Sequence, residues 1–219
     1  MNRLLLGLFW VFAIVYLATM HRAPFPAHWL VKAIPALSLA VLVKRNLEGR
    51  LGLLLAAALI FSAGGDIVLS FQEEGARAYF VEGLGLFLVA QLFYIVAFAL
   101  DRKYQPARLP LMLGIVALSG VMTMILLPHL GAMLIPVLVY LVVITGMGLM
   151  AALNTRGGLL LIVGAVLFLV SDATIAIDAF LWSAPHPVAP YVIMLTYYAA
   201  QFCIAMAFVR RNIFPAPDG

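Results

Sequence analysis

LGLLLAAALIFSAGGDIVLS, residues 51–70, is a run of apolar and small residues in which Asp66 carries the only charge. Its length matches the roughly 20 apolar residues that a helix needs to cross a bilayer. An ionised side chain at that depth costs at least about 2.5 kcal/mol. LFLVSDATIAI, residues 167–177, repeats the pattern, with Asp172 behind another apolar run. The two stretches predict membrane helices whose buried carboxylates have a function.

The composition of the whole chain agrees with this interpretation. Of 219 residues, 66% are hydrophobic and only 10% are charged, whereas soluble proteins have about 25% charged residues. The mean hydropathy is +1.14. The net charge of +4 is interpreted as a topology signal, and we expect no nucleic-acid partner. The single cysteine, Cys203, excludes an intrachain disulfide.

The sequence predicts an all-α integral membrane protein, a bundle of about eight transmembrane helices in a single domain covering residues 1–219. The first apolar stretch runs into His21 and Arg22 without a cleavage site of small residues, so it is interpreted as a retained helix. The second and fifth segments are short or close to a proline, which leaves a count of seven open. The predicted helices lie near residues 4–20, 28–43, 51–71, 80–100, 109–127, 131–152, 158–181 and 189–209.

The basic residues orient these helices. With eight spans, ten of the 13 Lys and Arg residues fall on the side that holds both termini. Arg22 and Arg77 lie on the other side, and Lys32 lies inside the second span. By the positive-inside rule, both termini are predicted to be cytoplasmic.

The two aspartates are predicted to lie at one level of the membrane. Asp66 comes fifteen residues into the third span and Asp172 fourteen into the seventh, which places both roughly 21–23 Å from the cytoplasmic end. Lys32, near the start of a descending span, lies in the same half. We therefore expect a shared polar chamber in the non-cytoplasmic half. The alternative is that Lys32 and Asp66 form an ion pair that only joins two helices.

Further polar residues are assigned to this chamber by helical spacing. Residues four apart share a face of a helix, as Ser62, Asp66 and Ser70 do. Tyrosine and glutamine also serve as structural hydrogen-bonding residues between membrane helices, so that alternative stays open. The candidate substrate-binding residues are Lys32, Ser62, Gln91, Tyr94, Tyr140, Ser171, Tyr198 and Gln201.

Neither a metal nor another cofactor is predicted. The four histidines, His21, His28, His129 and His186, fall at non-cytoplasmic connections, but they form no pair with metal-binding spacing. His21 and His28 flank prolines and are interpreted as interfacial residues. The glycine pairs lack the strand-to-helix context of a phosphate-binding loop. Gly64 and Gly65 are expected to allow close helix packing beside Asp66.

The spacing of the two aspartates is compatible with an internal repeat. Four spans separate them, so their helices cross in the same direction, and each follows an apolar run and a small residue. This pattern indicates a parallel duplication of four plus four spans, with one carboxylate from each half.

These residues resemble the YhhN-like family, which includes the transmembrane lysoplasmalogenases. The resemblance extends over the second to the eighth span, and its elements occur in the order of the family. One departure is Gln91, where the family often has histidine, so we expect hydrogen bonding rather than proton transfer there. The elements are Lys32 followed by Pro35, FSAGGDIVL (61–69), GLGLFLVAQLFYI (83–95), GAVLFLVSDATIAI (164–177) and YYAAQ (197–201).

The resemblance implies hydrolysis of the vinyl ether bond of a lysoplasmalogen, a single-chain ether lysophospholipid. The products are a fatty aldehyde and glycerophosphoethanolamine or glycerophosphocholine. Protonation of carbon requires an acid, and the resulting cation requires a carboxylate, so Asp66 and Asp172 are the predicted catalytic pair. Lys32 is expected to neutralise a carboxylate or to hold the substrate phosphate.

Two other classes of protein remain alternatives. A proton-coupled small-solute or lipid transporter also uses intramembrane carboxylates, although we find no matched pair of broken helices in the two halves. A structural membrane protein would leave the two buried charges unexplained. The compact chain and its simple loops favour a bacterial cytoplasmic membrane. Neither head-group preference nor oligomeric state follows from the sequence.

Overall fold

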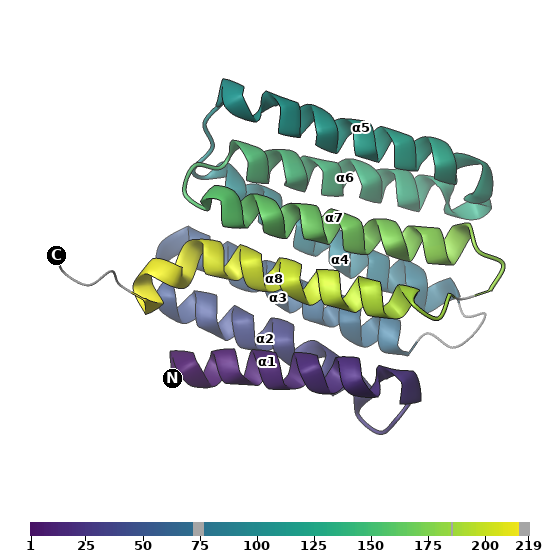
Figure 1. Cartoon of the computed structure of the whole chain (residues 1–219), viewed down its shortest axis with the longest axis horizontal. Coiled ribbons are helices and arrows are strands. Elements are labelled where there is room, and N and C mark those ends of the chain that lie inside the picture. The colour runs from purple at the N-terminus through teal and green to yellow at the C-terminus, as the bar shows by residue number, and fades with distance from the viewer. Residues whose placement is uncertain (72–76, 185, 215–219) are drawn as a thin grey trace. The chain divides into compact units, whose positions relative to one another are not determined.

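In the part of the chain that the computed structural model describes, eight long helices form an all-α, multi-pass protein (Figure 1). The structure describes residues 1–71, 77–184 and 186–214, with 77 and 78 as backbone only. The predicted position of Arg77 in a connection therefore concerns a side chain outside the described part. The helices are α1 (Asn2–Thr19), α2 (His28–Asn46), α3 (Gly49–Ser70), α4 (Arg77–Ala99), α5 (Leu109–Leu126), α6 (Leu134–Leu153), α7 (Gly158–Phe180) and α8 (Ala189–Ile213).

The predicted helices all occur, and their ends differ by a few residues. The clearest differences are at α2 and α8, which extend past the predicted 43 and 209. Their last turns contain Lys44 and Arg45, and Arg210 and Arg211. An apolar run marks the part of a helix inside hydrocarbon, but a helix continues into the interface, where cations at its carboxyl end interact favourably with its dipole.

Seven of the eight helices have the length and hydropathy of a membrane span. The exception is α2, which contains Lys32, Lys44 and Arg45 in its 19 residues. Long basic side chains at a helix end reach the interface, so Lys44 and Arg45 are compatible with a span. Lys32, whose exposure is 9%, is instead buried within the protein. The number of helices that cross the membrane stays a prediction.

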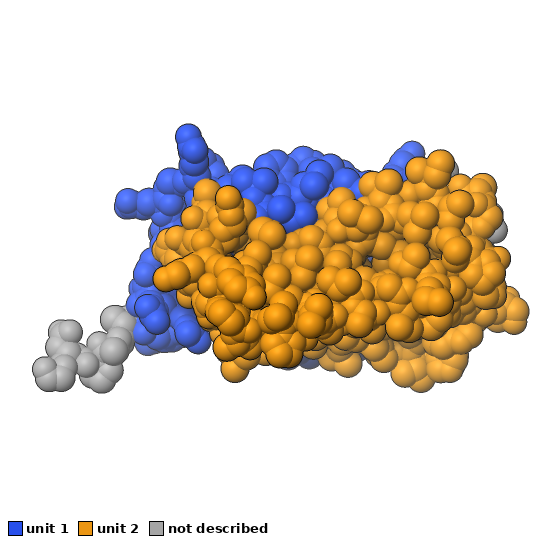
Figure 2. All heavy atoms as spheres, turned by 90° about the horizontal axis from the view of Figure 1, so that it is seen from above, with its two compact units in different colours: residues 1–97, 205–219 blue, residues 98–204 orange. Residues whose placement is uncertain are grey.

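The chain divides into two compact units, coloured separately in Figure 2. Unit 1 contains residues 1–97 and 205–219, and unit 2 contains residues 98–204. The first division falls at the end of α4, where a four-plus-four repeat would place its boundary. The second falls inside α8, whose last turns group with unit 1. The internal repeat and the single domain remain predictions.

Unit 1 is built on close packing of α2 against α3. Ala33 and Ala36 of α2 pack with Ala63 of α3 in one fully buried cluster. Small residues let two helix backbones approach closely in a membrane, where van der Waals contact drives association. Leu37 and Ile67 cover the edge of this cluster. The contact fixes α2 beside the half of α3 that contains Asp66.

Asparagine side chains join three helix ends at one end of unit 1. Asn2 and Asn46 exchange hydrogen bonds between their side-chain amides, at 2.9 and 3.1 Å. Asn212 donates to the Asn46 carbonyl oxygen at 2.6 Å. These bonds join the start of α1, the end of α2 and the end of α8. The start of α1 and the last turn of α8 therefore lie at the same end of this unit, and the cytoplasmic location of both termini stays a prediction.

Unit 2 contains α5, α6 and α7, which lie side by side (Figure 1). Its core cluster consists of Met122 and Leu126 of α5, Leu130 of the connection, and Val137 of α6. Ile177 of α7 packs against this cluster. Gly164 of α7 faces the carbonyl oxygen of Ala200, where an added Cβ would lie at 3.0 Å. The glycine thus permits close packing of α7 against α8.

A buried asparagine joins the two connections at one end of unit 2. Asn154 is fully buried, donates to the Phe98 carbonyl oxygen at 2.9 Å and accepts from the Gly157 backbone N–H at 2.8 Å. Arg108 donates to the Asn154 carbonyl oxygen at 2.7 Å. The end of α4 is thereby attached to the α6–α7 connection.

We expect Asn154→Ala to destabilise the protein by about 2–4 kcal/mol, because it leaves two buried backbone groups without partners. A protein of this size loses about 2–4 °C of melting temperature per kcal/mol. Thermal unfolding in detergent measures the change. Thr155→Ala is the control, because its hydroxyl bond to the Asp101 carbonyl oxygen is exposed. Equal melting temperatures for both variants would contradict this role of Asn154.

Candidate active site

The centre of the site in unit 1 is an ion pair between α2 and α3. Lys32 Nζ lies 3.6 Å from Asp66 Oδ1, and the side chains are only 11% and 3% exposed. Removing two charges from water is costly, and their attraction offsets that cost only when they remain together. The lysine favours the ionised form of Asp66. The predicted proximity of these residues is confirmed, and whether the pair also has a catalytic role stays a prediction.

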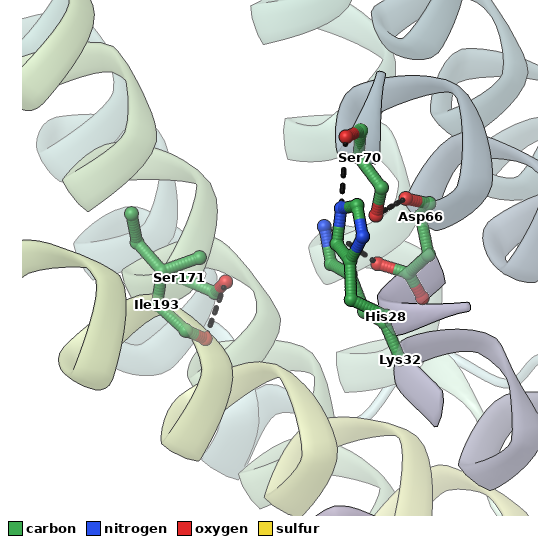
Figure 3. A network of polar contacts seen from close by, with 6 residues as sticks. All are labelled: His28, Lys32, Asp66, Ser70, Ser171 and Ile193. Atoms are coloured by element: carbon green, nitrogen blue, oxygen red, sulfur yellow. Dashed lines mark hydrogen bonds and ion pairs between the residues drawn. The ribbon is translucent and has the colours of Figure 1, made fainter. Parts of the chain in front are cut away.

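His28 lies one helical turn before Lys32 and belongs to the same polar cluster (Figure 3). Its Nε2 is 3.0 Å from the Ser70 carbonyl oxygen, and its Nδ1 is 3.0 Å from the Phe25 carbonyl oxygen. A carbonyl oxygen only accepts, so both contacts are hydrogen bonds when both ring nitrogens carry hydrogen. His28 thus attaches the first turn of α2 to the last residue of α3.

These buried contacts of His28 were not predicted from the sequence, and its interpretation as an interfacial residue, which concerns depth in the membrane, stays a prediction. Its exposure is 9%, and it takes part in the contacts that hold the ends of α2 and α3 together. The signal in the sequence was its spacing of four from Lys32, which places both side chains on one face. The phenol of Tyr16 in α1 also interacts electrostatically with Asp66. No pattern in the sequence indicated that tyrosine.

The polar face predicted for α3 is present. Ser62 and Asp66 are 0% and 2% exposed, and the hydroxyl of Ser70 donates to the Asp66 carbonyl oxygen at 2.8 Å. On α4, Gln91 and Tyr94 are fully buried. Gly65 packs against the Phe87 ring, where an added Cβ would come within 2.6 Å. Close packing beside Asp66 is therefore confirmed for Gly65, whereas Gly64 has only ordinary contacts.

The second aspartate has a different kind of partner. In unit 2, the Tyr140 hydroxyl of α6 donates a hydrogen bond to Asp172 Oδ2 of α7. Asp172 is half-buried and Tyr140 is buried. A phenol hydroxyl donates a hydrogen bond to a carboxylate and accepts one from a protonated carboxyl. The contact is therefore compatible with either charge state of Asp172. The structure thus brings together Tyr140 and Asp172, two of the predicted site residues.

The remaining candidates of unit 2 are buried. Tyr198 is 4% exposed and Gln201 is fully buried on α8. Ser171, beside Asp172, donates to the Ile193 carbonyl oxygen of α8 at 3.1 Å (Figure 3). Its hydroxyl thus serves helix packing, which is the structural alternative to substrate binding. Within the described residues, no three His, Cys, Asp or Glu side chains gather as metal ligands.

Comparisons with a family model and with individual proteins agree on one family. The sequence model of the YhhN family matches residues 27–208. No solved structure matches. Human lysoplasmalogenase TMEM86A is 38% identical over 200 residues, covering 84% of this chain and 78% of the human protein.

Similar proteins occur in other mammals and in bacteria. Bovine lysoplasmalogenase TMEM86A is 40% identical over 163 residues, covering 70% of this chain and 64% of the bovine protein. This chain thus spans less than two thirds of that relative. A lysoplasmalogenase of Mycobacterium bovis is 34% identical over 182 residues, covering 81% of this chain and 68% of the relative.

Proposed function

Because the chain belongs to the YhhN family, we propose that it is a membrane hydrolase that cleaves the vinyl ether bond of lysoplasmalogen. The similarity to mammalian and bacterial proteins named lysoplasmalogenase carries this proposal. The products are a fatty aldehyde and glycerophosphoethanolamine or glycerophosphocholine. The chemistry uses side chains that the chain itself provides.

A vinyl ether is hydrolysed by proton transfer to carbon. An acid protonates the alkenyl carbon beta to the ether oxygen, and the oxygen lone pair forms an oxocarbenium ion. Water attacks the carbon next to oxygen and gives up a proton to a base. The hemiacetal hydroxyl then gives up its proton while the bond from carbon to the glycerol oxygen breaks. The glycerol oxygen takes up a proton as it leaves, and the carbonyl of the aldehyde forms. The reaction thus needs a proton donor and a carboxylate, as paired acids provide in glycosidases.

We assign the carboxylate role to Asp66 and the donor role to Asp172. Lys32, 3.6 Å from Asp66, favours a negative charge on that carboxyl. A charged Asp66 stabilises the cation and accepts the proton of the attacking water. Asp172, bonded to the Tyr140 hydroxyl, then remains as the proton donor. The mechanism requires both carboxyls to reach one vinyl ether.

The substrate would be a single-chain lipid in the same membrane as the enzyme. Its tail would lie among the helices, and its head group would lie toward the non-cytoplasmic side. The compact chain favours a bacterial cytoplasmic membrane as its location, and relatives occur in bacteria. No cofactor takes part in the proposed steps.

The test is to incubate purified protein in detergent with lysoplasmalogen in D2O. We expect aldehyde with one deuterium at carbon 2, because the acid delivers a solvent-derived proton to that carbon. The saturated alkyl-ether analogue is the control and releases none, since it cannot form the oxocarbenium ion by protonation at carbon. A folded sample that releases no aldehyde would contradict the proposal. Uptake of solute into proteoliposomes without turnover would favour a transporter.

A further inference from the structure

The helices α3 and α4 pack antiparallel with a defined register. Gly83 of α4 lies against Leu69 of α3, and Phe87 lies against Gly65. Moving four residues toward the carboxyl end of α4 therefore corresponds to moving four residues toward the amino end of α3. One further step brings Gln91 to the level of residues 61 and 62. Ser62 and Gln91 therefore occupy the same layer, one helical turn from Asp66.

Contacts also show which side of the α3–α4 pair these residues occupy. Phe61 stacks on Phe93, with ring centroids 5.5 Å apart, and Leu86 lies 3.6 Å from the Cβ position of Gly64. These contacts mark one side of the pair. At about 100° per residue, the side chains of Asp66 and Gln91 lie on the opposite side. Ser62 lies about two helical turns before Leu69, which contacts α4, so its side chain lies near the line of contact between the two helices and toward the side of Asp66.

Ser62 and Gln91 also share an unusual property. The Ser62 hydroxyl and both polar atoms of the Gln91 amide are buried and have no hydrogen-bond partner among the described residues. Each such group costs free energy, because water no longer solvates it and nothing replaces the water. The two side chains lie in one layer but do not bond to each other. A third group between them would satisfy both.

We propose that Ser62 and Gln91 form a subsite for one hydroxyl oxygen beside Asp66. A hydroxyl group donates one hydrogen bond and accepts others, and the serine hydroxyl and the two ends of the amide provide the complementary donors and acceptors. This proposal rests on the proposed function. The oxygen comes either from the attacking water or from the C2 hydroxyl that distinguishes a lyso lipid from a diradyl lipid.

The position next to Asp66 gives the subsite a use in the reaction. The hydroxyl oxygen would be held one helical turn from the carboxylate that accepts the proton of the attacking water. A water or glycerol hydroxyl bound there would be oriented by two neutral side chains, with no titration of either. Buried polar residues that local packing does not satisfy are typical of functional sites, where stability is exchanged for binding.

The first test measures stability and needs no substrate. Gln91→Met and Ser62→Ala each remove an unsatisfied buried group with little change of shape. We expect each melting temperature in detergent to stay the same or to rise by about 2–4 °C. A fall would mean that the two side chains already have structural partners and would overturn the proposal. Ser38→Ala is the matched control, because its buried hydroxyl donates to the Pro35 carbonyl oxygen at 2.7 Å.

The second test measures turnover with lysoplasmalogen and with its 2-deoxy analogue. We expect each variant to lose roughly threefold to tenfold in kcat/KM on lysoplasmalogen, and Ser38→Ala to lose nothing. An equal loss on both substrates identifies the oxygen as water. A loss confined to lysoplasmalogen identifies it as the C2 hydroxyl.

The two tests separate this subsite from the proposed function. Full activity of both variants on both substrates would overturn the subsite while leaving the hydrolase intact. If the parent protein released no aldehyde, the proposed function would fail, and the melting temperatures would still decide whether Ser62 and Gln91 have structural partners.

Discussion

Asp66→Asn and Asp172→Asn each lower the release of aldehyde from lysoplasmalogen by about 100-fold or more. Proton transfer by a positioned side chain contributes about 100-fold to 10,000-fold, and an amide of the same shape neither donates an acidic proton nor carries a negative charge. Aldehyde formation in detergent, measured at equal amounts of folded protein, gives the ratio. Loss at both positions is expected because turnover needs both the acid that protonates carbon and the carboxylate that stabilises the cation and accepts a proton from water.

The matched control is Asp178→Asn, in the same helix as Asp172. Asp178 Oδ1 accepts a hydrogen bond from the His186 backbone N–H at 2.9 Å, outside the proposed chemistry. We expect this variant to keep the activity of the parent. If Asp66→Asn and Asp172→Asn also kept it, the carboxyls would not be the acid and base. Asp66→Asn leaves Lys32 without a negative partner, so its thermal stability must be measured beside its activity.

The hydrophobic pattern predicted the fold well because it reports directly on the membrane. Predominantly apolar runs, some of them containing a single charge such as Lys32 or Asp66, predicted all eight helices, and their errors are confined to ends such as that of α8, where the helix continues past the predicted end. The pattern says little about which helices touch. The packing of α2 on α3 through Ala33, Ala36 and Ala63 depends on small residues, which occur throughout membrane helices.

The part of the candidate site that contains buried charges could be predicted from the sequence. Asp66 needed a partner in hydrocarbon, and Lys32 was the basic residue inside a span, so their pairing followed from the cost of burial. The contact of His28 was not predicted, because it depends on the carbonyl oxygen of Ser70, which no sequence pattern marks. The lack of partners at Gln91 likewise depends on packing in three dimensions.

Lys32→Met destabilises the protein by about 3–5 kcal/mol, which corresponds to roughly 10 °C of melting temperature for a chain of this size. The reason is that the Asp66 carboxyl, only 2% exposed, loses the ammonium group that lies 3.6 Å from it. Thermal unfolding in detergent measures the loss. Lys44→Met is the control, because Lys44 is exposed in the last turn of the same helix.

The double variant Lys32→Met/Asp66→Leu isolates the cause. It removes both charges and fills the space with apolar side chains, so we expect most of the stability lost in Lys32→Met to return. The double variant should still release no aldehyde, because it lacks the Asp66 carboxylate. If the ion pair had only a structural role, the double variant would recover stability and would also keep the activity of the parent. A Lys32→Met variant as stable as the parent would show that Asp66 carries no buried charge that depends on Lys32. In that case Asp66 could not be the carboxylate that receives the proton from water, and the two aspartates would exchange their assigned roles.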